Sequence, residues 1–436
     1  MSNSRRPAQP PSSWARTLSR RLRAFGVAIS CVAILGLIAA ALVNCGGSSP
    51  TIRTDAPTGS HATSTAVLPM PLISRNVHAF SNVDCGFPAS AANDASYDTT
   101  WRGCNGQDAP TMSRPVWLAY DLSSVPAAQR AHVVLAWYSG CCSYDNAISG
   151  TGAYNIPGSY TIDANAAPGG ASTAPTAGWR TLVTVADNTY HSRQHRLELA
   201  GYNWVRINVT VSDGAPLNYD ASINMDVFDT DAGVTDDWIF YGDSITEGAM
   251  GQATQGGITS YAQLVNAAVP ANFPLEENGG IAAQTTASAR TYIPAQLALF
   301  GGHYVGLSYG TNDANGGCGT SACLSTFYDN FAHLVQDVIR AGKQPIVPTI
   351  PWGCTASLAA NVPAFNHQIQ KLYAAFPQIV KGPDLYSYFK AHQTYVSSND
   401  CIHPNATGMG LYRKQWANAM LNAVYKITLP AGTSRP

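Results

Sequence analysis

The chain has 436 residues, which is long enough for two domains of ordinary size. Its formal net charge is −1 and only 12% of its residues are charged, which argues against nucleic acid or any strongly charged partner. Gly, Ser, Thr, Ala, Asn and aromatic residues are plentiful instead, as in many exported proteins that handle neutral polymers.

Residues 1–45 are predicted to be an export signal or membrane anchor. An arginine-rich segment precedes the uncharged run "AFGVAISCVAILGLIAAALV" (24–43), which suits an export signal and could also span a bilayer uncleaved. The following "LVNCGGSSP" resembles a bacterial lipoprotein signal, in which Cys45 becomes the lipidated first residue, although Asn44 departs from the usual small residue. Lipoprotein, uncleaved anchor and clean secretion stay open. All three predict a folded part outside the cytoplasm, in the bacterial cell envelope or secreted.

The cysteines agree with export. Setting aside Cys31 and Cys45 leaves an even number, which suggests disulfides in an exported chain. These cysteines are Cys85, Cys104, Cys141, Cys142, Cys318, Cys323, Cys354 and Cys401. Their spacing contains no paired CxxC or histidine cluster, so no metal site is expected. For the second set we expect the pairs Cys318–Cys323 and Cys354–Cys401, although the sequence does not fix the pairing.

The next part of the chain predicts a tether followed by an all-β domain. Residues 46–75 are rich in Gly, Ser, Thr and Pro and predict a flexible linker. From 76 to 230, short apolar or alternating runs lie between turn residues, which predicts a β-sandwich. The runs are "VWLAYDL", "AHVVLAWYSG", "GSYTIDAN", "WRTLVTVADN", "HRLELAG", "WVRINVTVSDG" and "INMDVFD".

From 236 to 430 the pattern changes to alternating strands and helices, which predicts βαβ units and a parallel sheet. The expected strands are "WIFYG", "YVGLSYG", "QPIVPTIPW" and "IVKGPDLY". The expected helices include "CLSTFYDNFAHLVQDVIRAGK", "VPAFNHQIQKLYAAF" and "TGMGLYRKQWANAMLNAVYK". Ligands of such sheets bind outside the carboxyl ends of the strands. Ser244 and the segment "GTND" (310–313) both fall at ends of this kind.

Three of four short blocks point to one kind of chemistry. "WIFYGDSITEGAM" (238–250) places Ser244 at a strand end, where it either caps the next helix or acts as a nucleophile. "SYGTNDANGG" offers Asn312 as a donor to an oxyanion, or else forms only a turn. "NDCIHPNATG" places Asp400 three residues before His403, so that the carboxylate can orient a histidine base; alone it reads equally well as a polar surface loop.

A fourth block, "ENGGIAAQTT" (277–286), completes a resemblance to the GDSL, or SGNH, hydrolase family. The blocks occur in family order between residue 238 and the C-terminus, and the resemblance implies a flavodoxin-like α/β/α fold, a serine esterase, and no cofactor. It implies Ser244, His403 and Asp400 as catalytic residues and Ser244, Ala283 and Asn312 as the oxyanion hole. The family has glycine where this chain has Ala283. Ala283 keeps the N–H, but a positive φ would strain it. A register using Gly279 or Gly280 stays open.

The β-domain bears on the substrate. It looks like galactose-binding-like or carbohydrate-binding sandwiches. Its tryptophans Trp117, Trp137, Trp179 and Trp204 could stack on sugars, although we expect at least three to be core. We therefore predict an exported esterase that removes acyl groups, acetyl first of all, from a carbohydrate.

Three alternatives stay open. Two belong to the same family: a lipase or arylesterase, which an apolar stretch near the site would favour, and an O-acetyltransferase, which would use the same residues. The third is a non-catalytic surface carbohydrate-binding protein, which only Ala283 favours. We expect His303, His367 and His392 to be structural or solvated.

Overall fold

The computed structural model describes residues 72–83, 86–94, 99–103, 110–139, 156–188, 190, 192–212, 221–231, 236–251, 259–270 and 272–427. The predicted leader, Cys45, nearly all of the predicted linker, and four of the cysteines (Cys85, Cys104, Cys141 and Cys142) lie outside these residues. Within them, no helix combines the length and the apolar character needed to cross a membrane.

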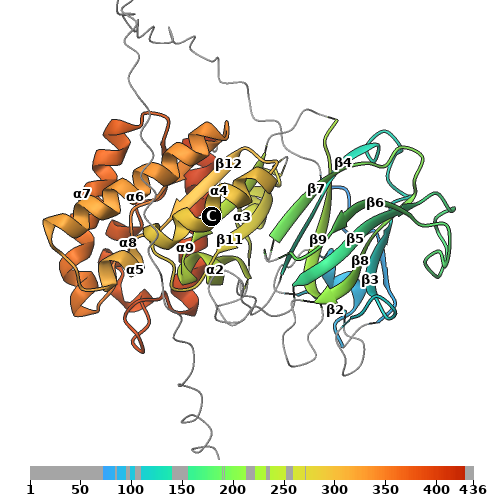
Figure 1. Ribbon diagram of the computed structural model, residues 1–436, viewed down its shortest axis with the longest axis horizontal. Coiled ribbons are helices and arrows are strands. Elements are labelled where there is room, and N and C mark those ends of the chain that lie inside the picture. Colours follow the sequence, from blue (N-terminus) through green and yellow to red (C-terminus); the bar gives the residue numbers. More distant parts are fainter. Residues whose placement is uncertain are drawn as a thin grey trace, which may run out of the picture. The chain divides into compact units, whose positions relative to one another are not determined.

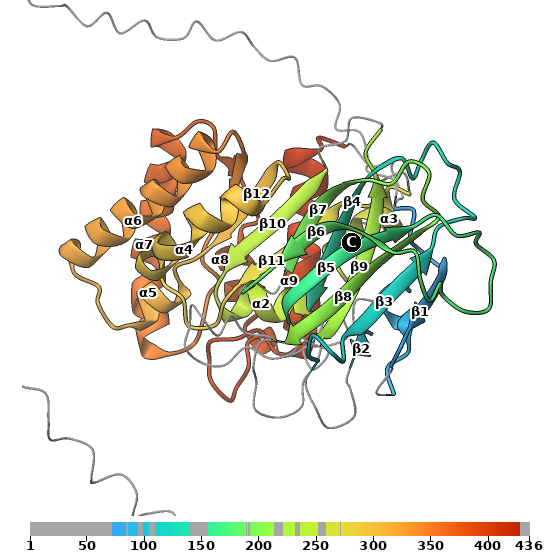
Figure 2. The same cartoon turned by 45° about the vertical axis from the view of Figure 1, so that its right-hand side comes forward.

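The first part of the described chain forms two antiparallel sheets, as predicted for a β-sandwich (Figure 1). One sheet has the strand order β1-β3-β8-β5-β6 and the other β2-β9-β4-β7. Figure 2 shows β5, β8, β3 and β1 side by side in that order. The strands are β1 (His78–Ser81), β2 (Trp101–Gly103), β3 (Val116–Asp121), β4 (His132–Ser139), β5 (Pro157–Asn165), β6 (Arg180–Val185), β7 (Ser192–Glu198), β8 (Trp204–Ser212) and β9 (Ala221–Asp229). A short 3₁₀ helix, η2 (Ala89–Ala92), follows β1.

All seven expected runs contribute a strand, but β7 begins earlier than the apolar pattern suggested. It starts at Ser192 because β4 pairs with it from His132 opposite Glu198 to Tyr138 opposite Ser192. Between the sheets lies a core of aliphatic and aromatic side chains. The long-range pairing with β4 therefore sets the limits of β7, and the local sequence does not.

The four tryptophans divide evenly, so the expectation that at least three are core was wrong. Trp137 and Trp204 are 0% and 1% exposed. Trp117 and Trp179 are only partly buried, and the Arg206 guanidinium lies 4.3 Å from the centre of the Trp179 ring. Trp117 pairs across the sheet with Asn208. Alternating side chains on a strand point to opposite faces, and the strand sequence alone does not say which face is covered.

The second part forms a five-stranded parallel sheet with helices on both sides, which confirms the predicted α/β fold. The strand order is β11-β10-β12-β13-β14. The strands are β10 (Asp237–Gly242), β11 (Leu275–Gly280), β12 (Tyr304–Ser308), β13 (Gln344–Val347) and β14 (Val380–Lys381). The helices are α2 (Ser244–Gly251), α3 (Tyr261–Ala268), α4 (Thr286–Leu299), α5 (Thr311–Asn315), α6 (Ser321–Arg340), α7 (Ala356–Ala375), α8 (Leu385–Ala391) and α9 (Ala406–Ala419). Two short turns of helix, η3 (Gln393–Tyr395) and the π-helical η4 (Met420–Val424), complete it.

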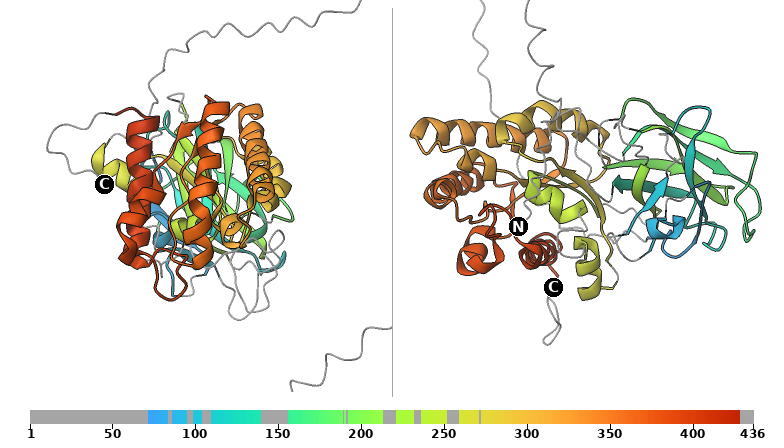
Figure 3. Two further views of the ribbon diagram at one scale, coloured as in Figure 1. Left: turned by 90° about the vertical axis from the view of Figure 1, so that its left-hand side faces the viewer. Right: turned by 90° about the horizontal axis from the view of Figure 1, so that it is seen from below.

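The central strand β10 shows why both faces are covered. Its side chains alternate between two cores: Ile239 and Tyr241 pack with residues of α4, α6 and α7, whereas Trp238 and Phe240 pack with residues of α3 and α9. A strand buried on both faces is apolar throughout, as "WIFYG" is. Figure 3 shows the orange helices and the red C-terminal helices on different sides of the sheet.

Two element boundaries differ from expectation. The segment after residue 378 forms only the two-residue strand β14, and the next helix begins at Leu385. Helix α7 begins at Ala356, before the expected start, and contains Pro363. Pro363 and Ala359, whose carbonyl loses its helical partner, are both exposed, so water can satisfy that carbonyl. Both disulfides expected in this part, Cys318–Cys323 and Cys354–Cys401, are present.

Candidate active site

The candidate nucleophile lies where β10 passes into helix α2. The chain turns at Asp243, whose carboxylate accepts the Ile245 N–H at 3.0 Å. Asp243 therefore serves the helix start, and the Ser244 hydroxyl is left for another partner. That partner is His403, whose Nε2 lies 2.7 Å from Ser244 Oγ. The contact gives Ser244 the geometry of a nucleophile beside a base.

Gly242, just before this turn, has no room for a side chain. A Cβ there would lie 2.1 Å from Oγ1 of Thr246 and 2.9 Å from the carbonyl oxygen of Ser308. The close approach lets β10 end directly beneath the first turn of α2. Steric crowding therefore explains why residue 242, just before Asp243 and Ser244, is glycine.

His403 is oriented by Asp400, three residues earlier on the same loop. The Asp400 carboxylate accepts from His403 Nδ1 at 2.8 Å, and its other oxygen accepts the N–H groups of Ile402 and His403 at 2.9 and 3.1 Å. Partial burial opposes ionisation, but these donors hold the pKa of Asp400 below its ordinary value. Asp400 therefore stays a carboxylate at neutral pH, which fixes Nε2 as the nitrogen that faces Ser244.

The loop that holds Asp400 and His403 is fastened on both sides. The Ser397 N–H donates to the His403 carbonyl at 2.8 Å. Cys401, between the two candidate residues, is bonded to Cys354, and the Cys354 N–H also donates to the Cys401 carbonyl at 2.9 Å. Asn405 caps α9 by accepting the Gly408 N–H at 3.0 Å.

Ala283, which stands where the family has glycine, adopts a positive φ and is therefore strained. Its φ is +62°. It is the third residue of a turn in which the Gln284 N–H approaches the Ile281 carbonyl at 3.4 Å, and a type II turn requires a positive φ there. Gly280, part of the alternative register, lies inside β11 and donates its N–H to Asn278 at 3.0 Å. The N–H of Ala283 thus remains our candidate oxyanion donor.

Asn312 and Asp313 lie at the start of α5, after β12, and have different tasks. The Asn312 amide donates one N–H to the Gln284 carbonyl at 3.0 Å, and a second N–H remains on the same nitrogen. The Asp313 carboxylate accepts the Thr286 hydroxyl at 2.6 Å and the Thr286 N–H at 3.1 Å. These two bonds tie the "GTND" segment to the residues that follow Ala283.

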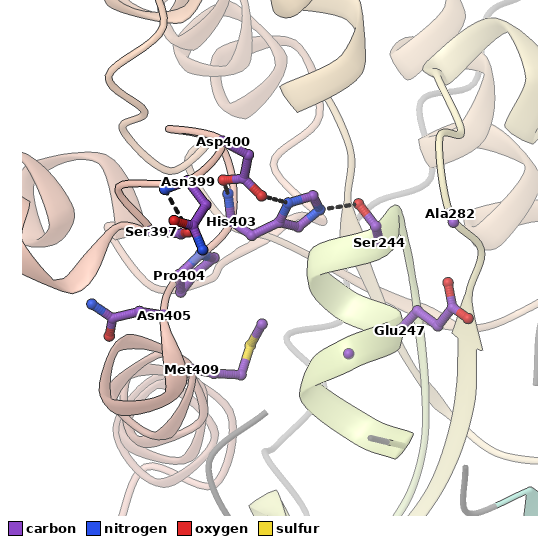
Figure 4. A pocket seen from close by; sticks show the side chains of 11 residues that line it. Ser244, Glu247, Ala282, Ser397, Asn399, Asp400, His403, Pro404, Asn405 and Met409 are labelled. Atoms are coloured by element: carbon purple, nitrogen blue, oxygen red, sulfur yellow. Dashed lines mark hydrogen bonds and ion pairs between the residues drawn. The ribbon is translucent and has the colours of Figure 1, made fainter. Parts of the chain in front are cut away.

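A cavity of about 480 Å³ opens beside Ser244. Figure 4 shows Asp400, His403 and Ser244 joined in a line, with Met409 and Glu247 on different sides of helix α2. Polar and apolar atoms contribute about equally to the cavity wall; seven of the eleven lining residues carry polar side chains, and Met409 is the long apolar one. The lining residues are Ser244, Glu247, Gly248, Ala282, Ser397, Asn399, Asp400, His403, Pro404, Asn405 and Met409. In the described part of the chain, no cluster of His, Cys, Asp or Glu side chains could hold a metal ion.

Residues 240–411 match the model of the GDSL-like Lipase/Acylhydrolase family. This part of the chain belongs to that family. These residues therefore form a carboxylic ester hydrolase domain. No curated protein matched it.

Solved structures similar to the acylhydrolase domain include a lipase/acylhydrolase from Enterococcus faecalis (18% identity, 42% of this chain, 94% of the other, TM-score 0.35) and a catalytic mutant of an acetylxylan esterase from Geobacillus stearothermophilus (17%, 44%, 94%, 0.33). A chitosan-binding module from a Paenibacillus sp. chitosanase/glucanase also matched (22%, 36%, 98%, 0.25).

Two groups that border the candidate site were not among the residues predicted from the sequence blocks. Gln284, whose carbonyl holds Asn312, acts through its backbone, so its residue type gave no signal. Glu247 lies one helical turn after Ser244 and lines the cavity, and that spacing could have flagged it. Of the three histidines set aside, His303 is half-buried and His392 stacks on Tyr388 at 4.6 Å, in keeping with structural positions.

Proposed function

We propose that the protein is an exported esterase that removes short acyl groups, first of all acetyl, from a carbohydrate through an acyl-serine intermediate. The observation that supports this most directly is the continuous chain of contacts from Asp400 through His403 to Ser244, at the edge of a cavity to which seven of the eleven lining residues bring polar side chains. A polar lining suits a hydroxyl-rich substrate better than a long hydrocarbon chain.

The proposed mechanism uses one proton acceptor and one group of donors. His403 Nε2 takes the proton of Ser244 Oγ as the oxygen attacks the ester carbonyl. The N–H groups of Ser244 and Ala283 and the Asn312 amide stabilise the negative charge on the carbonyl oxygen. His403 then returns the proton to the leaving alcohol, and a water molecule activated by the same histidine releases the acid.

The β-sandwich supports the carbohydrate half of the proposal through its exposed aromatic surface. Trp117 is partly exposed on the sheet that contains β8, where Asn208 lies opposite it. An exposed indole beside an amide is a combination that binds sugar rings by stacking and hydrogen bonding. We propose that this sheet face, and not the buried Trp137 or Trp204, contacts the polysaccharide.

Export is proposed from the leader and the disulfides. The arginine-rich, then apolar N-terminus resembles an export signal, and both Cys318–Cys323 and Cys354–Cys401 are of the kind that persist in oxidising compartments. Attachment to the membrane through the N-terminal segment or a lipidated Cys45 is proposed with it.

The test compares acid release from p-nitrophenyl acetate, a longer-chain p-nitrophenyl ester and acetylated xylan. We expect release from the two acetates to exceed release from the longer ester, and Ser244→Ala to reduce it by at least about 10⁴-fold. Ser397→Ala is the matched control because Ser397 lines the same cavity without touching His403 through its hydroxyl. Release that is undiminished in Ser244→Ala would overturn the mechanism.

The same assay separates the alternatives. A preference for the longer ester would indicate a lipase or arylesterase. Faster acyl transfer to an added sugar than to water would indicate an O-acetyltransferase. Binding of acetylated xylan without any turnover would indicate a carbohydrate-binding protein, the alternative that the strained Ala283 favours.

A further inference from the structure

Glu247 is a buried acid beside the candidate nucleophile, and the mechanism above does not use it. It lies on α2, one turn after Ser244, and lines the same cavity, yet only 2% of its surface is exposed. Figure 4 shows its carboxyl on the side of the helix that faces the segment containing Ala282. A carboxyl in this position is available to the backbone of that segment and not to bulk water.

The helix cannot move Glu247 away from this segment. A Cβ on Gly280, the last residue of β11, would lie 2.3 Å from the Glu247 N, so α2 rests directly on the end of the strand. The Asn278 amide adds a contact to the Glu247 carbonyl at 3.5 Å. The start of α2 and the end of β11 therefore form one packed unit, with the turn 281–284 emerging beside the Glu247 side chain.

The carboxyl is neutral at ordinary pH. Burial, opposed by the Ala282 N–H and reinforced by the Asp243 carboxylate, raises the pKa of Glu247 to about 9. Neither carboxyl oxygen has a partner at full hydrogen-bond geometry within the described part of the chain. Of the elements packed on α2, β11 holds Glu276 and Glu277, α9 holds Tyr412, Arg413 and Lys414, and β10 holds Asp237 and Tyr241. Asp243 is the ionisable group whose charge acts on Glu247.

We propose that Glu247 is a positioning residue: its carboxyl, which faces the segment containing Ala282, attracts the Ala282 N–H from short of full hydrogen-bond geometry and thereby holds the turn so that the next N–H, that of Ala283, faces the oxyanion. The inference rests on the proposed function, because it needs an oxyanion at Ser244. A neutral carboxyl is required, since a carboxylate would place a second negative charge near the oxygen on which charge develops.

Glu247→Gln and Glu247→Leu test this, with p-nitrophenyl acetate as the substrate. Glutamine keeps a neutral oxygen acceptor, so we expect kcat at pH 7.5 to stay within about threefold of wild type, whereas leucine lowers kcat about tenfold at nearly constant KM. Wild-type kcat should fall as pH rises through about 9, while Glu247→Gln keeps its activity there. Glu198→Gln, at an exposed glutamate of β7, is the control for the charge change.

Equal loss in both Glu247 variants, or the same alkaline decline in wild type and Glu247→Gln, would overturn the proposal. A second readout does not depend on activity. Because the folded-state pKa is raised, ionising Glu247 destabilises the fold as pH rises from about 4.5 to about 9. The melting temperature of Glu247→Gln should therefore exceed that of wild type increasingly over this range. A wild type without Ser244-dependent release would instead overturn the proposed function and the positioning role with it, even if this melting difference is seen.

Discussion

The loop 397–405 and the turn 281–284 both border the cavity beside Ser244, but they are held in different ways. In the loop, Asp400 accepts three hydrogen bonds, and a disulfide at Cys401 fixes the chain between Asp400 and His403. The turn has one backbone bond of 3.4 Å and an alanine at φ +62°. The loop proposed to transfer protons is thus covalently fastened, whereas the turn proposed to stabilise charge depends on its neighbours and bears strain.

The largest loss of kcat is expected from replacing the carboxylate of Asp400 in the loop 397–405. Asp400→Asn removes the acceptor that orients His403 Nδ1–H, so we expect kcat for p-nitrophenyl acetate to fall on the order of 10³- to 10⁴-fold, with KM nearly unchanged. Asp384→Asn makes the same chemical change at the N-cap of α8, where asparagine also caps, and should leave kcat unaltered. A loss below about tenfold would show that the loop orients His403 without Asp400.

A smaller loss of kcat is expected from replacing Asn312, the side chain proposed as an oxyanion donor. Asn312→Ala removes the proposed oxyanion donor and should lower kcat by about 10²- to 10³-fold. Asn315→Ala is the control, since Asn315 lies on the same short helix and its side chain accepts from the Thr355 hydroxyl at 3.0 Å. Equal kcat values in the two variants would show that Asn312 is not an oxyanion donor. Its role would then be the structural hydrogen bond to the Gln284 carbonyl.

The two disulfides give a third comparison. Cys354–Cys401 closes a sequence separation of 47 and Cys318–Cys323 one of 5. Replacing both cysteines of a pair by serine should cost about 4 kcal/mol of unfolding free energy for the first and about 2 kcal/mol for the second, if chain entropy dominates. Only the first replacement should also lower kcat in the folded protein, because only Cys401 lies between Asp400 and His403. Urea unfolding and initial rates measure the two effects, and equal rates in both variants would contradict the second.

The contacts of the loop 397–405 could be predicted from the sequence, and those of the turn 281–284 only in part. Ser244, Asp400 and His403 lie in short blocks whose spacing already implies their contacts, and the parallel sheet brings strand ends together. The positive φ of Ala283 occurs in a turn that follows the close approach of α2 to β11 at Gly280, and no local sequence pattern contains that contact between segments. The burial of Glu247 likewise depends on contacts between segments and could not be predicted from local sequence. Pro363 lies inside α7 although proline normally ends a helix, because solvent exposure of that site offsets the lost hydrogen bond.

The smallest effect, and the most specific, is expected at Ala283 itself. Glycine has no penalty at φ +62°, so Ala283→Gly should raise the free energy of unfolding by about 1 kcal/mol, less the entropy that glycine adds to the unfolded chain. At Ala282, whose φ is not positive, the same substitution should lower it by about 0.5–1 kcal/mol. Both variants keep their N–H groups, so kcat should change little. Urea unfolding measures both changes in the free energy of unfolding. A gain at residue 283 and a loss at residue 282 would locate the strain in the turn. A loss at both positions would mean that side-chain packing, and not backbone strain, decides whether alanine or glycine is more stable at residue 283.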